Sequence, residues 1–250
     1  MHPVAVVSPH LDDAVLSAWL TLTSNRPTRV VSCFAGLPPP SLQGSWDQRT
    51  GLSSSSAVAL RRAEDVAALA LTDSEAVHLD LLDEQYRGGG DAPRAQLTAL
   101  LRDHLADAAE VWLPAGLGGH VDHIAARDAA LSATTPAQRL RLYADLPYAG
   151  QPAWPVDVTG APRDLIVNGL LSVLGRPTRA QVWRSVLDVG GVRMDVARRQ
   201  VVKLTRAQFK QKRVAVHRYR SQMAALRCGR RHPLRERRLF AYEVYWMLDL

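Results

Sequence analysis

The chain has 250 residues, of which 47% are hydrophobic and 22% are charged, and this balance excludes an intrinsically disordered protein. The length suits one large domain, or one domain with an appended subdomain. No apolar stretch approaches the roughly 20 residues of a membrane span, and no signal peptide precedes the first predicted strand, so we expect a cytoplasmic protein. With Cys33 and Cys228 as its two cysteines, the chain is not a disulfide scaffold.

The net charge of +7 is unevenly distributed. Lys and Arg dominate the stretch 198–238, in which Glu236 is the one acidic residue. Such a stretch can bind anions or nucleic acid, or it can be a solvated helix face. Because aromatic residues are not interleaved with the basic ones as a base-stacking surface requires, we do not expect a nucleic-acid partner.

Up to residue 150, apolar runs of strand type alternate with segments of helical periodicity. In chain order the pattern predicts a strand over 4–7, a helix over 14–24, a strand over 29–35, a helix over 57–71, a strand over 76–81, a helix over 93–108, a strand over 111–114, a helix over 124–132 and a strand over 140–145. This alternation predicts an α/β fold with a doubly wound, mostly parallel sheet and helices on both faces. The Pro-, Gly- and Ser-rich connection 37–56 is long enough to be a lid or a binding loop, with Trp46 and Asp47 as candidate lid residues.

The alternation breaks after residue 150, where prolines separate short apolar pieces up to Lys203. We interpret 151–205 as an insertion that extends over the active-site face. The remaining segment, 206–250, is predicted to contain a helix over 206–226 and a closing strand over 239–247. We expect the core 1–150, the insertion and this C-terminal segment to form a single domain.

Two short segments carry the chemistry, namely His10-Leu11-Asp12-Asp13 and His120-Val121-Asp122-His123. Each follows a predicted strand and leads into a helix, and parallel sheets of this class bind ligands at the carboxyl ends of their strands. Asp and His bind divalent ions, and a catalytic site keeps three protein ligands with one open position. Residues 10, 13 and 123 can supply the three ligands, with His120 beside the ion. The alternative is that Asp12 or Asp13 only caps the helix that follows.

The paired motifs resemble the PIG-L/LmbE-like family of zinc-dependent N-deacetylases, whose signature joins an (A/P)-H-P-D-D segment to a later H-x-D-H segment. The first motif departs from this signature at Leu11, and the second matches it in full. Supporting stretches are Arg61-x-x-Glu64, the segment 79–83, Lys212-x-x-Ala215 and the segment 219–222. The likeness covers 4–145, resumes near Lys212 and implies a Rossmann-like fold.

The resemblance also implies roles. One Zn²⁺ ion would be held by His10, Asp13 and His123. Asp12 would be the general base, His120 would stabilise the oxyanion and would be a strong donor if cationic, and Asp122 would orient a histidine.

Substrate contacts follow from the same resemblance. Arg61 and Asp83 match positions that contact sugar hydroxyls in some members. Some members also carry a tyrosine at the position of Gly118, so any donor role of that tyrosine must belong here to another group or be absent. Outside the motifs, the stretch 145–148 after the fifth predicted strand is a candidate for the pocket rim.

The sequence therefore predicts a zinc-dependent hydrolase that removes an acyl group, most simply acetyl, from an amino sugar in a GlcNAc-containing small molecule or glycoside. One alternative is an amidase acting on a sugar-linked or amino-acid-linked amide. Another is a non-catalytic metal- or anion-binding α/β module, and a phosphoesterase is a weaker one because few ligands are left for a second ion. The expected partner is a small-molecule amino sugar, and the sequence is compatible with a homo-oligomer.

Overall fold

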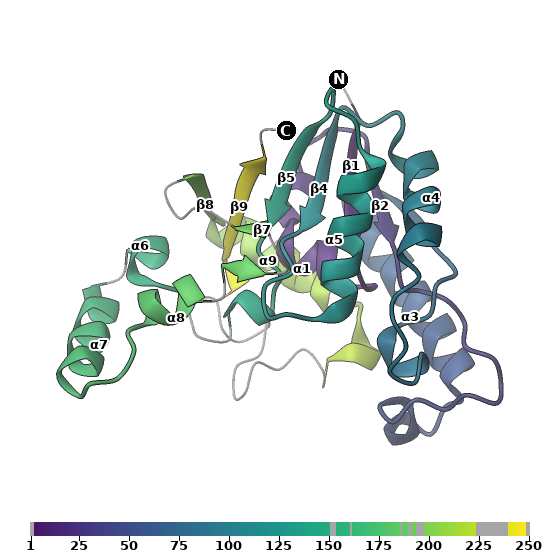
Figure 1. Ribbon diagram of the computed structural model, residues 1–250, viewed down its shortest axis with the longest axis horizontal. Coiled ribbons are helices and arrows are strands. Elements are labelled where there is room, and N and C mark those ends of the chain that lie inside the picture. The colour runs from purple at the N-terminus through teal and green to yellow at the C-terminus, as the bar shows by residue number, and fades with distance from the viewer. Residues whose placement is uncertain are drawn as a thin grey trace.

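The computed structural model describes residues 3–150, 154–160, 162–185, 187–189, 192–193, 198–223 and 240–248. Its main sheet has seven strands in the order β3-β2-β1-β4-β5-β9-β8 (Figure 1). The strands are β1 (Val4–Ser8), β2 (Thr28–Ser32), β3 (Glu75–His78), β4 (Glu110–Pro114), β5 (Arg139–Tyr143), β8 (Arg199–Lys203) and β9 (Tyr242–Leu248). Neighbours from β3 to β5 are parallel, and β9 is antiparallel to both β5 and β8. The predicted doubly wound, mostly parallel sheet is confirmed.

Helices cover both faces of this sheet (Figure 1). On one face α4 (Arg94–Leu105) packs against α5 (Val121–Ala133), and on the other lie α1 (Asp13–Ser17), α3 (Ser54–Leu69) and α9 (Arg206–Val216). Every residue of β1 and β4 is buried, because helices enclose the central strands on both sides. The parallel strands end at a common edge, the lower one in Figure 1, and both His/Asp segments follow strands that end there.

The prediction of one continuous helix over 14–24 is wrong. The helix is broken at Ala18 into α1 and α2 (Trp19–Leu22), because the carboxylate of Glu243 on β9 accepts hydrogen bonds from the backbone N–H groups of Trp19 (2.9 Å) and Leu20 (3.0 Å). The same carboxylate accepts a bond of 2.8 Å from Nζ of the buried Lys212. A residue more than two hundred positions away thus ends the helix, and local periodicity cannot reveal it.

The predicted helix 206–226 is also too long. Helix α9 ends at Val216, and the chain then turns so that the Tyr219 hydroxyl reaches Asp65 on α3 (2.7 Å). Ser221 donates to Glu64 through both its N–H (2.9 Å) and its hydroxyl (2.6 Å). These bonds to α3 replace the helical ones, and residues 224–239, with Cys228 and much of the basic stretch, lie outside the described residues.

The insertion forms structure of its own. Its helices are α6 (Val156–Thr159), α7 (Pro162–Val173) and α8 (Arg179–Ser185), followed by the hairpin of β6 (Asp188–Val189) and β7 (Val192–Arg193). The ring centroids of Trp154 and Trp183 lie 5.5 Å apart, and those of Trp183 and Trp246, on β9, lie 6.0 Å apart. Aromatic packing therefore attaches the insertion to the sheet. Figure 1 shows these helices beside the β8–β9 end of the sheet, and coverage of the active-site face stays a prediction.

The last residues of the segment interpreted as an insertion form β8 at the edge of the main sheet. Helix α3 begins at Ser54, three residues before the predicted start, since the Ser53 hydroxyl caps it by accepting from the N–H of Ser56 (3.2 Å). Cys33 is fully buried. In the part of the chain that the structure describes, no helix is long and apolar enough to cross a membrane.

Candidate metal centre and active site

The first motif is a tight turn between β1 and α1. The hydroxyl of Ser8 donates to the carbonyl of His10 (2.6 Å) and accepts from the N–H of Ala14 (3.1 Å). The carboxylate of Asp13 accepts from the backbone N–H of His10 (2.8 Å), so it closes the turn on itself. As a result the side chains of His10 and Asp13 point to one side of the turn, with Nδ1 of His10 3.3 Å from Oδ2 of Asp13.

The second motif starts α5 and is held from the neighbouring strand. Asp145, directly after β5, places one carboxylate oxygen 2.7 Å from Nδ1 of His123 and the other 2.9 Å from the N–H of Leu117. Both Asp145 and His123 are completely buried. This pairing keeps the His123 proton on Nδ1 and turns the Nε2 lone pair toward the first motif, as carboxylates that accept the other ring N–H do for metal-binding histidines. The stretch 145–148 thus reaches the site, as the sequence suggested.

The two motifs meet at one point. His10, Asp13 and His123 each offer a ligand atom, and these atoms lie within 4.8 Å of one another. The Nε2 of His123 is 3.3 Å from Oδ2 of Asp13, and it is buried with no hydrogen-bond partner among the described residues. The Nε2 lone pair and the carboxylate oxygen are both electron-pair donors, so a positive charge between them would stabilise their close approach. A divalent cation fits that position, and the donor set of two imidazoles and one carboxylate is typical of zinc.

The charges of the three groups support this arrangement. Burial opposes the charge of Asp13, but His123 and His10 outweigh it and lower the pKa of this carboxyl to about 2. Burial likewise opposes protonation of His123, whereas Asp13 and Asp145 raise its pKa above the ordinary value. The site therefore favours positive charge between the imidazole and the carboxylate, whether a proton or a metal ion supplies it.

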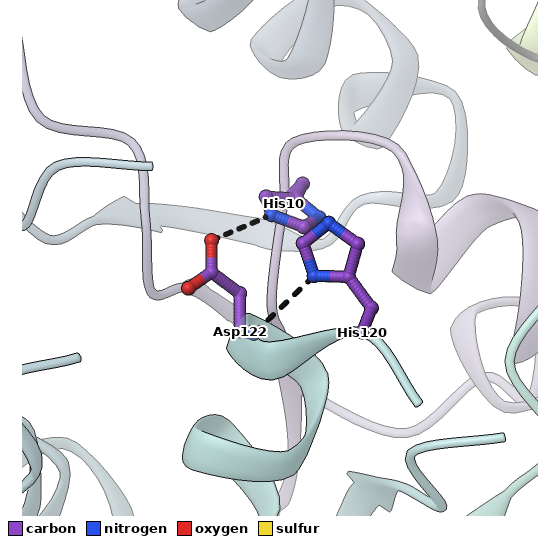
Figure 2. Close-up of side chains that lie close together, drawn as sticks. All are labelled: His10, His120 and Asp122. Atoms are coloured by element: carbon purple, nitrogen blue, oxygen red, sulfur yellow. Dashed lines mark hydrogen bonds and ion pairs between the residues drawn. The ribbon is translucent and has the colours of Figure 1, made fainter. Parts of the chain in front are cut away.

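A second group of possible ligands consists of His10, His120 and Asp122, drawn in Figure 2. Its carboxylate is already occupied. Asp122 lies 3.2 Å from Nε2 of His10 and accepts from the N–H of Glu84 (3.0 Å) and from the Arg87 guanidinium (2.6 Å). Asp122 is therefore better suited to orienting His10 than to binding a metal. Its contact with Nε2 of His10 leaves Nδ1 of that ring facing Asp13.

Asp12, in the first motif, does not cap the helix that follows it. It occupies the N-cap position of α1, but its side chain makes no cap hydrogen bond, so the alternative that Asp12 only caps the helix is wrong. The side chain is buried, and burial together with the charge of Asp13 raises its pKa to about 7. A carboxylate with such a pKa can exchange a proton near neutral pH.

His120 is neutral in this structure. Its Nδ1 accepts a hydrogen bond of 3.2 Å from the N–H of Asp122, which places the ring proton on Nε2 (Figure 2). Burial and the nearby His10 and His123 lower its pKa to about 4. These surroundings favour the neutral ring over the cationic form considered from the sequence, and the neutral ring offers its Nε2–H as a donor. This Nε2 lies 3.5 Å from a carboxylate oxygen of Glu84.

The two predicted sugar contacts lie in different surroundings. Asp83 is at the site, with its carboxylate 3.8 Å from Nε2 of His10 and its side chain 26% exposed. Arg61 is buried and forms an ion pair with Asp47, while a 3.4 Å bond joins it to the Tyr86 hydroxyl. A sugar contact through Arg61 stays a prediction, and the contacts observed for this side chain fasten the loop 37–56 to α3.

That loop is anchored at several points. Asp47 is completely buried. The N–H of Gly44 donates to the Ser54 hydroxyl (2.8 Å), and the Gln43 amide donates to the carbonyl of Leu52 (3.0 Å). The middle of the loop is thus bonded to its own C-terminal end and to α3.

Sequence reasoning missed Glu84, Arg87 and the contact by which Asp145 orients His123. A signal existed for Asp145, because it directly follows the strand beside β4 and so ends at the same sheet edge. No comparable signal marks Arg87, which reaches Asp122 from a loop 35 positions earlier in the chain. His78 bonds to Asp65 (2.8 Å) and belongs to neither group of possible ligands.

Fold and site together define an α/β protein with a His/Asp cluster, suited to one divalent ion, at the carboxyl edge of its parallel strands. The model of one family, GlcNAc-PI de-N-acetylase (PIG-L), matches residues 5–134. The chain belongs to this family. A search of curated proteins gives no match.

Solved structures similar to this chain include several deacetylases. A triple mutant of the deacetylase of the teicoplanin biosynthetic pathway is 27% identical, with a TM-score of 0.71 over 99% of this chain and 98% of that one. The zinc-inhibited form of teicoplanin deacetylase is 25% identical (TM-score 0.68; 98% and 97% covered). The deacetylase of the A40926 pseudoaglycone is also 25% identical (TM-score 0.69; 98% and 97% covered).

Proposed function

We propose that the protein is a zinc-dependent hydrolase that removes the N-acetyl group from an amino sugar of a glycoside. One observation carries the proposal: the buried Nε2 of His123 has no hydrogen-bond partner among the described residues and faces the carboxylate of Asp13, which directly follows the buried Asp12 in the chain. Three ligands with an adjacent, non-ligating base are what amide hydrolysis requires. A site that only bound a metal would not need Asp12.

His10, Asp13 and His123 would hold the ion. When bound, zinc lowers the pKa of water to about 7 and polarises a carbonyl group. Asp12 accepts a proton from the attacking water as the new C–O bond forms, and it returns that proton to the amide nitrogen as the C–N bond breaks. The products are acetate and the free amine, and such acid–base assistance contributes roughly 10²–10⁴-fold in rate.

The remaining groups stabilise and orient. The Nε2–H of His120 donates toward the acyl oxygen as negative charge develops there. Asp122 and Arg87 hold His10, and Asp145 holds His123, so both imidazoles are fixed before substrate arrives. Preorganisation of this kind lowers the barrier because the protein pays no reorganisation during the reaction.

The substrate class follows from family membership and from the neighbours. The deacetylases reported above align with this chain over nearly their whole length, and their names give teicoplanin and the A40926 pseudoaglycone. We therefore place a GlcNAc-type sugar on a large aglycone first among candidates, with Asp83 as the contact to a sugar hydroxyl. An amidase acting on a sugar-linked or amino-acid-linked amide is the second candidate.

The test combines metal analysis with a substrate panel. The purified protein is loaded with one equivalent of Zn²⁺ and incubated with N-acetylglucosamine, simple N-acetylglucosaminides, a glycopeptide pseudoaglycone that carries N-acetylglucosamine, and N-acetyl amino acids. Acetate release from the glycosides, abolished by chelation and restored by zinc, supports the proposal. Release only from the amino acids favours the amidase, and a bound ion with no release from any compound contradicts both.

A further inference from the structure

Tyr148, in the segment that follows β5, packs its ring on both histidines of the second motif. The ring centroid lies 5.1 Å from that of His123, with the two planes at 82°. It lies 5.8 Å from that of His120. The half-buried phenol therefore forms a wall of the site, next to one of the three candidate ligands and next to the donor Nε2–H.

Gly118 provides the space for this ring. Its φ is +92°, in the left-handed region that favours glycine, and a Cβ placed on it would lie 2.7 Å from Cβ of Tyr148. Two independent requirements thus exclude a side chain at position 118. The volume above this residue is filled by the phenol from the neighbouring loop.

The loop of Tyr148 is tied to the ligand histidine. Asp145 bonds to Nδ1 of His123 (2.7 Å) through its side chain, and its carbonyl accepts from the N–H of Ala149 (2.7 Å). Ala149, directly after Tyr148, is therefore held by the residue that also fixes His123. This connection gives the phenol a defined position relative to the candidate ion.

The hydroxyl of Tyr148 makes no hydrogen bond to any residue that the structure describes. Other tyrosines differ: the hydroxyl of Tyr143 donates to the carbonyl of Val7 (2.8 Å), and that of Tyr219 to Asp65 (2.7 Å). Burial raises the pKa of Tyr148 most, and nearby carboxylates raise it further, namely those of Asp13, Asp12, Asp145 and Asp83. The Tyr148 hydroxyl therefore lies within the electrostatic field of the acidic groups of the site. A phenol is protonated at neutral pH even at its ordinary pKa, so a donor is available here.

We infer that the Tyr148 hydroxyl donates a hydrogen bond to the acyl oxygen of the substrate, and that this bond strengthens as the oxygen becomes negatively charged. The acyl oxygen is chosen over a sugar hydroxyl because the phenol lies on His120 and His123, around which the reacting carbonyl must sit. Asp83 lies on the side of His10 instead. Together with the Nε2–H of His120, the phenol gives the oxyanion two donors. This inference rests on the proposed deacetylation.

The test is Tyr148→Phe, which removes the hydroxyl and keeps the ring. Losing one oxyanion donor lowers kcat by roughly 10²–10³-fold, and we expect this loss with little change in KM. Affinity for a methylphosphonamide of the amino sugar, a tetrahedral mimic measured by calorimetry, should fall with it, whereas affinity for the amine product should not. Tyr245→Phe, a half-buried tyrosine on β9, is the matched control and should change none of these values.

A second variant, Gly118→Ala, tests the same geometry while the Tyr148 side chain keeps its hydroxyl. Its Cβ should displace Tyr148 and reproduce the loss of kcat with zinc still bound. The inference is overturned if Tyr148→Phe keeps wild-type kcat and wild-type affinity for the mimic. It is also overturned if the variant loses zinc or thermal stability in proportion to activity, because the role is then structural. Wild-type protein that releases no acetate from the panel refutes the proposed deacetylation instead, so the two failures are distinguishable.

Discussion

Asp145→Asn is the sharpest perturbation of the candidate centre, because it changes one atom of a buried residue that is not itself a ligand. The carboxylate now accepts from two donors, Nδ1–H of His123 and the N–H of Leu117. An amide has one acceptor oxygen and one donor nitrogen. Whichever way it faces, one partner is mismatched: either Leu117 loses its acceptor, or His123 must take the tautomer whose proton sits on Nε2.

The expected size follows from these two options. An unsatisfied buried N–H costs about 1–3 kcal/mol of stability. The wrong tautomer blocks the lone pair that would bind zinc, and loss of an outer-shell partner typically weakens metal affinity by roughly 10–100-fold. We therefore expect the zinc Kd of Asp145→Asn to rise by about one to two orders of magnitude, together with a lower free energy of unfolding of the metal-free protein.

The assay is a competition titration with a chromogenic chelator, combined with urea unfolding of the metal-free protein. Asp107→Asn is the control, since that aspartate is 61% exposed and pairs with Arg29; exposed pairs contribute roughly 0.2–1 kcal/mol, and this change should leave zinc affinity unaltered. A zinc Kd for Asp145→Asn within twofold of wild type would show that Asp145 does not set the tautomer of His123, and the assignment of His123 Nε2 as a ligand would fail with it.

Three further outcomes are expected. Asp12→Asn should retain zinc, measured by metal analysis, yet lose roughly 10²–10⁴-fold in kcat, and retention of activity would remove Asp12 from the base role. Asp12 must be deprotonated to accept a proton, and its pKa is raised to about 7, so kcat/KM should fall as pH drops through that region. A bound cation moves this acidic limb of the pH–rate profile to lower pH. If Asp12→Glu does not shift the acidic limb, the assignment of Asp12 as the base is contradicted. Glu243→Gln should cost about 3–5 kcal/mol in urea unfolding, since it leaves the buried Lys212 without its counter-charge, whereas Lys212→Met combined with Glu243→Gln should recover part of that loss.

The fold was largely predictable because its determinants are local and periodic. Apolar runs such as Val4 to Val7 can only be buried strands, and helices between them require a parallel sheet. The same rule placed both His/Asp motifs at one edge. What failed depended on single distant side chains: Glu243 breaks the first helix at Ala18, and the Asp65 and Glu64 carboxylates end α9 early. Neither break has a sequence signal at the place where it occurs.

The candidate site was predictable in its members and not in its connections. The motifs contain His10, Asp13 and His123, and the structure brings ligand atoms of these three together. The charge state of His120 was not predictable, because it depends on a backbone N–H at the start of α5 and on two neighbouring imidazoles. Partners such as Arg87 come from loops whose course is set by tertiary packing, so spacing along the chain carries no information about them.

The carboxylates of the centre are separated in function by their partners rather than by their positions along the chain. Arg87 and His10 outweigh burial and hold the pKa of Asp122 well below its usual range, and His123 and His10 lower that of Asp13. Asp12 lacks a comparable donor, so burial and the adjacent negative charge raise its pKa. Titratable groups whose environments push their pKa values apart identify the acid and the base of a site. Two aspartates that stay ionised can therefore hold imidazoles and metal while Asp12, one position along the chain from Asp13, is left to move the proton.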